Sequence, residues 1–247
     1  MTTIDGKRYA KFDLHVHTAE TSKCGTVSAP DLVRTYKNNG YDGFVVTDHL
    51  HETYISLQNC RDDWQECVTR FLFGYQEAKR VGDEIGFTVA LGAELRFPEN
   101  DSDYLLYGID EAFLRENPYL FNTDHASFFR KYGDRILIIH AHPFRDCDVV
   151  FYDSIHGLEV INCNPRQKNR NEFALQLAKE NPHLIRVCGS DAHRPGDEAR
   201  AAVLFEDAPR DSFEVRSAIL GGRMRLWCPD SESIIQESES MVCASTR

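Results

Sequence analysis

Two histidines separated by one valine end a short apolar run near the start of the chain, in the stretch KFDLHVHTAETSKCG at residues 11–25. Successive side chains of a β-strand point to opposite faces, so His15 and His17 should project side by side from one strand. Such a pair is either a polar feature at the rim of a sheet or part of a metal site. Further ligand-type residues at other strand ends would favour the metal site.

In the rest of the chain, short apolar runs alternate with helical patterns. The strands and helices that they predict must position the possible metal ligands. Strands are predicted over residues 11–17, 43–49, 87–97, 104–109, 135–142, 158–162, 185–193 and 201–207. Helices are predicted over residues 29–40, 61–85, 171–181 and 210–222. The repeated order of strand and helix predicts an α/β fold with parallel strands, and the number of strands favours a closed barrel.

Residues that commonly bind metals stand at the C-terminal ends of five of these strands. They are His15 and His17, then His49, Glu94, His142, and finally Asp191 with His193. Active sites of parallel α/β folds collect at these strand ends. Imidazole and carboxylate ligands together suit Zn²⁺, Mn²⁺ or Fe²⁺. Because the carboxylates of Glu94 and Asp191 can each bridge two cations, the set predicts a site with more than one metal.

Asp48 directly precedes His49 in the motif VVTDH. Carboxylates beside a metal-binding histidine often accept a hydrogen bond from its second ring nitrogen and fix the orientation of the ring. We therefore expect Asp48 to orient an imidazole rather than to bind a metal itself.

The ordered motifs DLHVHT, VVTDH, GAE, AHP and GSDAH resemble those of the polymerase and histidinol phosphatase (PHP) family of metal-dependent phosphoesterases. The resemblance spans roughly residues 11–207 and implies a distorted (β/α)7 barrel with two or three divalent metal ions, Zn, Mn or Fe. It assigns the first metal to His15, His17, Glu94 and Asp191. It assigns a second metal to Glu94 and His142, with Glu94 as the bridge, and a third metal to His49 and His193.

Two positions depart from the family pattern. The family often has another histidine several residues after the HxH pair, where this chain has Lys23 followed by Cys24. It also often has a histidine in the strand after the glutamate motif, where this chain is expected to place Tyr104. The second and third sites therefore each lack one ligand of the fullest pattern, which leaves occupancy of a third site open.

The resemblance implies hydrolysis of a phosphate ester. Bound divalent metals lower the pKa of a coordinated water toward about 7 and neutralise charge on phosphoryl oxygens. Two such metals can hold the attacking and leaving oxygens in line, so we expect metal-bound hydroxide rather than a protein side chain to attack. Basic side chains should complete the phosphate pocket, and the candidates are Arg145, Arg194, Arg166 and Lys23.

Three functions fit this reading. The favoured one is hydrolysis of a small phosphorylated molecule; the alternatives are a nuclease or nucleotide-processing phosphodiesterase, and a non-catalytic metal-binding module. The chain carries 39 acidic and 28 basic residues and a formal net charge of −11, which disfavours an extended nucleic-acid surface. The retained ligand set argues against the non-catalytic module.

Composition places the chain among globular proteins, with 247 residues, 42% of them hydrophobic and 27% charged. We expect one domain over residues 1–229 and a polar tail over residues 230–247. The N-terminal stretch MTTIDGKRYAKFD lacks the apolar core of a signal peptide, and no apolar run reaches the roughly 18 residues of a membrane span. The eight cysteines form no CxxC pair, so we expect reduced thiols and a cytoplasmic location.

Overall fold

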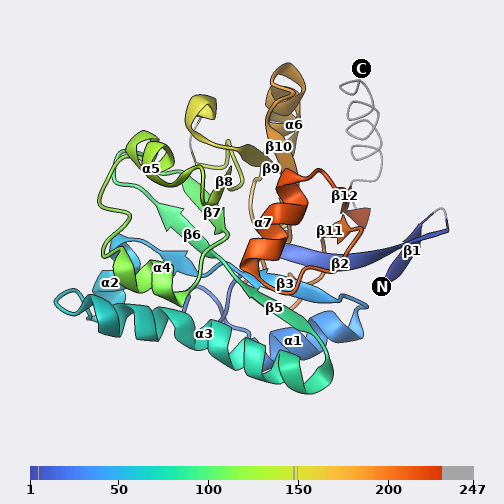
Figure 1. Ribbon diagram of the computed structural model, residues 1–247, viewed down its shortest axis with the longest axis horizontal. Coiled ribbons are helices and arrows are strands. Elements are labelled where there is room, and N and C mark those ends of the chain that lie inside the picture. The colour runs from blue at the N-terminus through green and yellow to red at the C-terminus, as the bar shows by residue number, and fades with distance from the viewer. Residues whose placement is uncertain (5, 147, 149, 230–247) are drawn as a thin grey trace.

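Figure 1 shows the computed structural model of the chain, which describes residues 1–4, 6–146, 148 and 150–229. The described strands form two six-stranded sheets. The predicted polar tail, residues 230–247, lies outside the described residues.

The first sheet has the strand order β12-β11-β2-β3-β5, with β1 paired to the outer part of β2. Its strands are β1 (Thr2–Ile4), β2 (Lys7–Val16), β3 (Gly43–Val46), β5 (Thr88–Leu91), β11 (Ala202–Phe205) and β12 (Met224–Trp227). The strands β2, β3 and β5 run parallel, as the sequence predicts, whereas β11 is antiparallel to both β2 and β12.

The second sheet has the order β10-β9-β8-β7-β6-β4. Its strands are β4 (His49–Leu50), β6 (Ala93–Arg96), β7 (Asp103–Tyr107), β8 (Leu137–His140), β9 (Gly157–Asn162) and β10 (Ile185–Gly189). The strand β7 is antiparallel to both of its neighbours. The expectation of parallel strands throughout is therefore wrong at β7 and β11, and the mixed α/β class is confirmed.

The two sheets meet along two seams. The predicted strand over residues 87–97 breaks at Gly92, so that β5 pairs in the first sheet and β6 in the second. A Cβ atom on Gly92 would lie 2.9 Å from a methyl group of Val45, which explains why glycine stands at the break. At the other seam a parallel bridge joins Val16 to Ala192. Within the described residues the hydrogen-bonded ladder is thus divided between two sheets that meet at these seams.

Four helices match the predicted ones with slightly shorter ends: α1 (Ala29–Asn38), α3 (Trp64–Ile85), α6 (Asn171–Glu180) and α7 (Ser212–Leu220). The additional helices are α2 (Glu52–Gln58), α4 (Glu111–Glu116), α5 (His125–Tyr132) and the 3₁₀ turn η1 (Tyr152–Ser154). Figure 1 shows α3 running along the lower edge of the molecule, below the strands of the first sheet. Among the described helices, none combines the length and the apolar character needed to cross a membrane.

The first sheet lies between two apolar layers. On β3, Phe44 and Val46 pack into a cluster that includes Leu32 and Val33 of α1. Val45, which points to the opposite face, belongs to the larger cluster between the sheets. Alternate side chains of one strand thus contribute to both apolar layers. The polar residues that follow the strands lie together at the strand ends.

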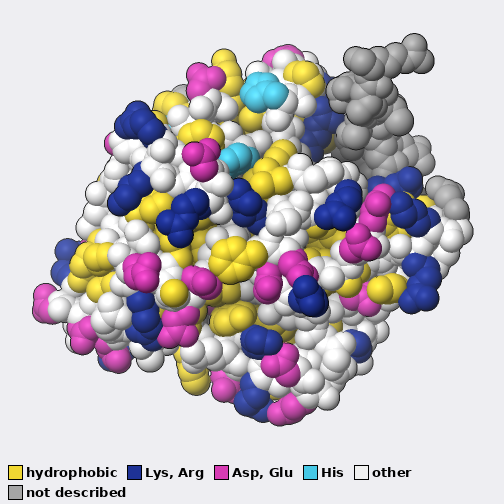
Figure 2. Space-filling view, viewed as in Figure 1, with side chains coloured by type: hydrophobic (Ala, Val, Ile, Leu, Met, Phe, Trp, Pro, Cys, Tyr) yellow, Lys and Arg dark blue, Asp and Glu magenta, His cyan; other side chains and the backbone are white. Residues whose placement is uncertain are grey.

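The cysteines and the distribution of surface charge complete the description. Cys60 and Cys67 form a disulfide at the start of α3, so the expectation of reduced thiols throughout is wrong for this pair. Among the other cysteines that the structure describes, Cys24, Cys163, Cys188 and Cys228 are not joined in disulfides. On the face shown in Figure 2, acidic and basic side chains are interspersed, so neither charge gathers into one large patch there.

Candidate metal centre

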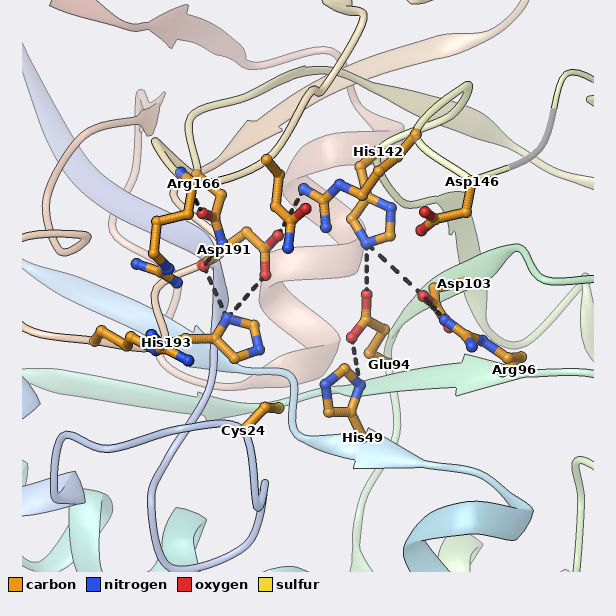
Figure 3. Close-up of a pocket in the computed structure, with 14 residues that line it drawn as sticks. Cys24, His49, Glu94, Arg96, Asp103, His142, Asp146, Arg166, Asp191 and His193 are labelled. Atoms are coloured by element: carbon orange, nitrogen blue, oxygen red, sulfur yellow. Dashed lines mark hydrogen bonds and ion pairs between the residues drawn. The ribbon is translucent and has the colours of Figure 1, made fainter.

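The predicted ligand residues come together in one place, as Figure 3 shows for most of them. His15 lies near the end of β2 and His17 directly after it, His49 begins β4, and Glu94 lies within β6. The remaining ligands follow strands: His142 comes after β8, and Asp191 and His193 come after β10. Beside them is a cavity of about 300 Å³. The fold therefore brings together residues that are up to 178 positions apart in the sequence, from His15 to His193.

Five candidate ligand atoms of four side chains lie close together. The Nε2 atoms of His15 and His17 are 3.0 Å apart, and Nε2 of His15 lies 3.4 Å from an oxygen of Glu94 and 3.4 Å from Oδ1 of Asp191. Nε2 of His17 lies 3.5 Å from the other oxygen of Glu94 and 3.4 Å from Oδ1 of Asp191. Ligands about 2.1 Å from one tetrahedral ion are themselves about 3.4 Å apart. The spacing therefore fits one cation held among these four side chains.

Glu94 presents its two carboxylate oxygens to different histidines. Oε1 lies 3.0 Å from Nε2 of His142, and Oε2 lies 2.7 Å from Nδ1 of His49. The side chain is only 1% exposed. A carboxylate placed in this way can be shared between neighbouring cations, which agrees with the bridging position that the resemblance implies.

Two buried atoms of the cluster are without a hydrogen bond in the described part of the chain, namely Nδ1 of His49 and Oε2 of Glu94. They face each other at 2.7 Å, although their geometry is not that of a hydrogen bond. Buried polar atoms rarely remain without partners. A cation bound beside these two atoms would accept an electron pair from each and so satisfy both. The residues present therefore fit a metal.

The expectation that Tyr104 takes the place of a ligand is wrong, because its neighbour Asp103 faces the cluster. In the pairing of β6 with β7, Asp103 lies opposite Arg96 and Tyr104 lies opposite Leu95. The ring of Tyr104 instead stacks on His140, with ring centroids 5.0 Å apart. Asp103, Glu94 and His142 form a group whose ligand atoms all lie within 4.8 Å of one another, so Asp103 can complete the second site.

The loop after the HxH pair also differs from the expectation by one residue. Lys23 is exposed and does not line the cavity, whereas Cys24 does. In Figure 3 the side chain of Cys24 points toward the space between His49 and His193. His17, His49 and His193 form a further group with ligand atoms within 4.8 Å of one another. Cys24 is therefore the residue that approaches the third predicted site.

Glu159 on β9 supports the cluster and was not predicted from the sequence. Its carboxylate lies 2.9 Å from Nδ1 of His15 and accepts a hydrogen bond from the backbone N–H of His142 at 2.8 Å. The residue is fully buried. The contact with His15 fixes the ring so that Nε2 faces the other ligands. A single acidic residue inside the apolar stretch LEVIN was the signal that could have identified it.

Asp48 supports the site less directly than expected. Its Oδ1 atom accepts hydrogen bonds from the backbone N–H of Thr18 at 2.8 Å and from the hydroxyl of Ser22 at 2.6 Å. The Ser22 oxygen lies 3.3 Å from Nδ1 of His17. The prediction that Asp48 contacts an imidazole directly is thus replaced by contact through Ser22, and the same carboxylate holds the loop that follows the HxH pair.

Three predicted phosphate-binding arginines line the cavity together with Arg96. The guanidinium of Arg145 donates to Asp191 and Asn162, each at 2.8 Å, and Arg166 pairs with Asp197. In the described part of the chain no polar contact is made by the guanidinium of Arg194, which is exposed at the rim. Lys23, the fourth candidate, lies outside the cavity lining.

The charges of the cluster are strongly coupled. Burial works to lower the pKa of His15, but three neighbouring carboxylates, chiefly that of Glu159, outweigh it and raise that pKa well above the ordinary value. Burial works to raise the pKa of Glu94, but the imidazoles of His49 and His15 outweigh it and lower that pKa well below the ordinary value. The Glu94 carboxylate therefore remains ionised and draws positive charge into the cluster, either as protons on imidazoles or as metal ions.

Two ligands also have unusual backbone angles. His142 has φ = 28° and Asp191 has φ = 52°, and Phe144, close to His142, has φ = 71°. Residues other than glycine rarely adopt positive φ, and those that do collect at functional sites where surrounding contacts hold them in place. Here Glu159 holds the N–H of His142, and Arg145 holds the side chain of Asp191.

Comparisons with known proteins identify a family and similar folds. The PHP domain family matches residues 13–198 of the chain. The fold resembles that of a two-domain protein from Bacteroides vulgatus containing a predicted PHP-like metal-dependent phosphoesterase, with a TM-score of 0.64 and 19% identity over 92% of this chain and 67% of that chain. It also resembles a predicted metal-dependent phosphoesterase from Bifidobacterium adolescentis, with a TM-score of 0.53 and 15% identity over 85% of this chain and 95% of that chain.

No curated protein sequence matches the chain significantly. The family match nevertheless covers most of the chain and includes every predicted metal ligand. The chain therefore belongs to the PHP domain family, the family of metal-dependent phosphoesterases that its motifs resemble.

Proposed function

We propose that this chain hydrolyses the phosphate ester of a small molecule with the help of two or three divalent metal ions. The observation that carries the proposal is the convergence of His15, His17, Glu94 and Asp191, whose imidazole nitrogens lie 3.4–3.5 Å from the carboxylate oxygens. Metals bound there would activate water and neutralise phosphoryl oxygens.

The side chains divide into groups with distinct tasks. The quartet named above would hold one ion. Glu94 with Asp103 and His142 would hold a second, and the group of His17, His49 and His193 would provide a third position. Imidazole with carboxylate suits Zn²⁺, Mn²⁺ or Fe²⁺. Glu159 and Ser22 orient two of the imidazoles and leave their Nε2 atoms directed at the cluster.

Among the predicted phosphate-binding residues, Arg194 is the best placed. Its guanidinium is free of polar contacts in the described part of the chain, so all its donors remain available to a substrate. Arg145 and Arg166 also line the cavity, but their charges are already paired with Asp191 and Asp197. We infer that Arg194 binds the phosphate and that Arg145 serves chiefly to hold Asp191.

A small substrate is favoured over a nucleic acid by the size of the cavity. A volume of about 300 Å³ is at the lower end of the range for small-molecule pockets. The formal net charge of −11 also opposes binding along a polyanion. A cytoplasmic location stays a prediction, and the Cys60–Cys67 disulfide removes part of its support.

The test is a hydrolysis screen on protein that has first been stripped with a chelator and then given Mn²⁺ or Zn²⁺. The substrates are p-nitrophenyl phosphate, sugar phosphates, nucleoside monophosphates, histidinol phosphate, bis-p-nitrophenyl phosphate and a single-stranded oligonucleotide. We expect metal-dependent release of inorganic phosphate from at least one monoester. Cleavage of only the diester or the oligonucleotide would favour the phosphodiesterase alternative. Bound metal without any hydrolysis would favour the non-catalytic module.

A further inference from the structure

The group formed by His17, His49 and His193 contains three imidazoles and no carboxylate of its own. The rings are close, with centroids 4.5 Å apart for His17 and His49 and 4.1 Å apart for His17 and His193. Oε2 of Glu94 and Nδ1 of His49 are buried beside this group without hydrogen bonds in the described part of the chain. These unpartnered donors point to a cation, and the group has room for one further ligand.

Cys24 occupies the open side of this group. It lines the same cavity as His49 and His193. Figure 3 shows the side chain directed between the two rings.

The loop that carries Cys24 is fixed from three sides. The carboxylate of Asp48 holds Thr18 and Ser22. The N–H of Gly25 donates to the carbonyl of Ser22 at 2.8 Å, and the N–H of Thr26 donates to the carbonyl of His193 at 2.7 Å. The position of the thiol is therefore set by the same contacts that hold the HxH pair and His193.

We propose that Cys24 is a metal ligand, so that its thiolate and the imidazoles of His49 and His193 together hold one ion. The inference deepens the proposed function, because it concerns one position of the same metal cluster. A thiolate with two imidazoles is a donor set for Zn²⁺, whereas the carboxylate-containing positions nearby also accept Mn²⁺. The chain would then have one metal position that prefers thiophilic ions, beside one or two positions whose carboxylate ligands prefer harder ions. Lys23 would bind none of these metals.

Cobalt(II) gives a readout that does not depend on catalysis, because a cobalt–thiolate bond produces a charge-transfer absorption band in the near ultraviolet. Metal-free protein is titrated with Co²⁺ while absorbance and bound cobalt are measured. We expect the band in the wild-type protein and its loss in Cys24→Ser and Cys24→His. Zinc affinity, measured by competition with a chromogenic chelator, should fall roughly 10- to 100-fold or more in Cys24→Ser. The matched control is Cys163→Ser, a free cysteine outside the cavity lining, which should keep the band.

Alkylation provides a second measurement on the unmodified chain. Zinc should protect Cys24 from iodoacetamide, as read by mass spectrometry, and removal of zinc should expose it. Cobalt bound without a thiolate band, or a band that survives in Cys24→Ser, would overturn the assignment of Cys24 while leaving the proposed function intact. Failure to bind any cobalt or zinc would overturn both.

Discussion

At the scale of single residues, Glu94 is the side chain on which most of the cluster depends. It is within 3.5 Å of ring nitrogens of His15, His17, His49 and His142. Glu94→Gln keeps the shape but removes the charge and one of the two acceptor oxygens. We expect near-complete loss of hydrolysis and loss of at least one bound metal, with the fold intact by circular dichroism. Activity within a few-fold of wild type would exclude a bridging role, and Glu99→Gln, outside the cavity lining, is the control.

The protonation of the imidazoles leads to a second residue-scale prediction. Carboxylates nearby raise the pKa of His15 and His49 above the ordinary value, and that of His193 to about 10, against the effect of burial. When no metal is bound, these rings therefore hold a proton more tightly than a free imidazole does, and His193 is protonated at pH 7. Because a metal needs the neutral ring, binding must release protons, and the apparent affinity must fall as the pH is lowered.

Calorimetry can measure this release. Zn²⁺ is titrated into metal-free protein in two buffers of different ionisation enthalpy, and the difference in observed heat gives the number of protons released. We expect at least one proton per chain at pH 7. Equal heats in both buffers would show that the rings are already neutral.

The two arginines at the cavity should behave differently. Arg145 holds Asp191 and Asn162, so Arg145→Ala should weaken metal binding roughly 10- to 100-fold, and Arg145→Lys should restore only part of it. Arg194 makes no polar contact with its guanidinium in the described residues, so Arg194→Ala should leave the bound metal unchanged. It should instead lower kcat/KM roughly 10- to 100-fold, as expected for a lost charged hydrogen bond of about 1.5–3 kcal/mol.

Elemental analysis of each purified variant, together with its kinetics, separates these roles. If Arg145→Ala keeps its metal and loses only kcat/KM, then Arg145 binds phosphate, as its position in the motif first indicated.

At the scale of elements, the approach of β10 to β2 is what brings Asp191 to the two histidines. Gly189 ends β10, and a Cβ atom there would lie 2.4 Å from Cβ of His15 and 2.6 Å from Oε1 of Glu159. Gly189→Ala should therefore push the strands apart and cost about 1–3 kcal/mol of unfolding free energy. It should also weaken metal binding, because both displaced side chains support the first metal position.

Denaturant unfolding and metal titration measure the two effects. Gly221→Ala is the control, since Gly221 has an ordinary φ of −76° at the end of α7 and meets nothing closer than 3.2 Å. Equal stability of the two variants would mean that the seam can open without disturbing the ligands.

The elements also show which parts of the candidate site can be predicted from the sequence and which cannot. The convergence of the candidate ligands was predictable because histidines and acids at the ends of apolar runs have few structural explanations. Asp103 was missed because choosing between it and Tyr104 requires the register of β7, which depends on its antiparallel pairing with β6. Cys24 and Lys23 are adjacent in a loop, where no periodicity shows which one faces inward. The short helices α2 and α4 lack the length at which an apolar period becomes visible.

At the scale of the whole molecule, the metal cluster connects the two sheets. His15 comes from β2 of the first sheet, whereas Glu94 on β6 belongs to the second. Burying these charged and polar groups side by side is costly unless a cation balances them. A metal that binds only the folded chain stabilises it by about 2.7 kcal/mol at one hundred times its Kd. The chain should therefore be markedly less stable without metal.

Scanning calorimetry of the metal-free protein, with Mn²⁺ or Zn²⁺ added stepwise, tests this link. For a chain of this size a stabilisation of about 2.7 kcal/mol corresponds to a rise in Tm of roughly 5–11 °C. Tm should continue to rise with metal concentration after the site is nearly saturated. The reason is that metal binds only the folded chain, so each increase in free metal shifts the equilibrium further from the unfolded chain. Glu94→Gln should show a much smaller rise, since it lacks the charge that the cations neutralise. A Tm that is independent of metal in the wild-type chain would mean that the sheets, and not the cluster, hold the fold together.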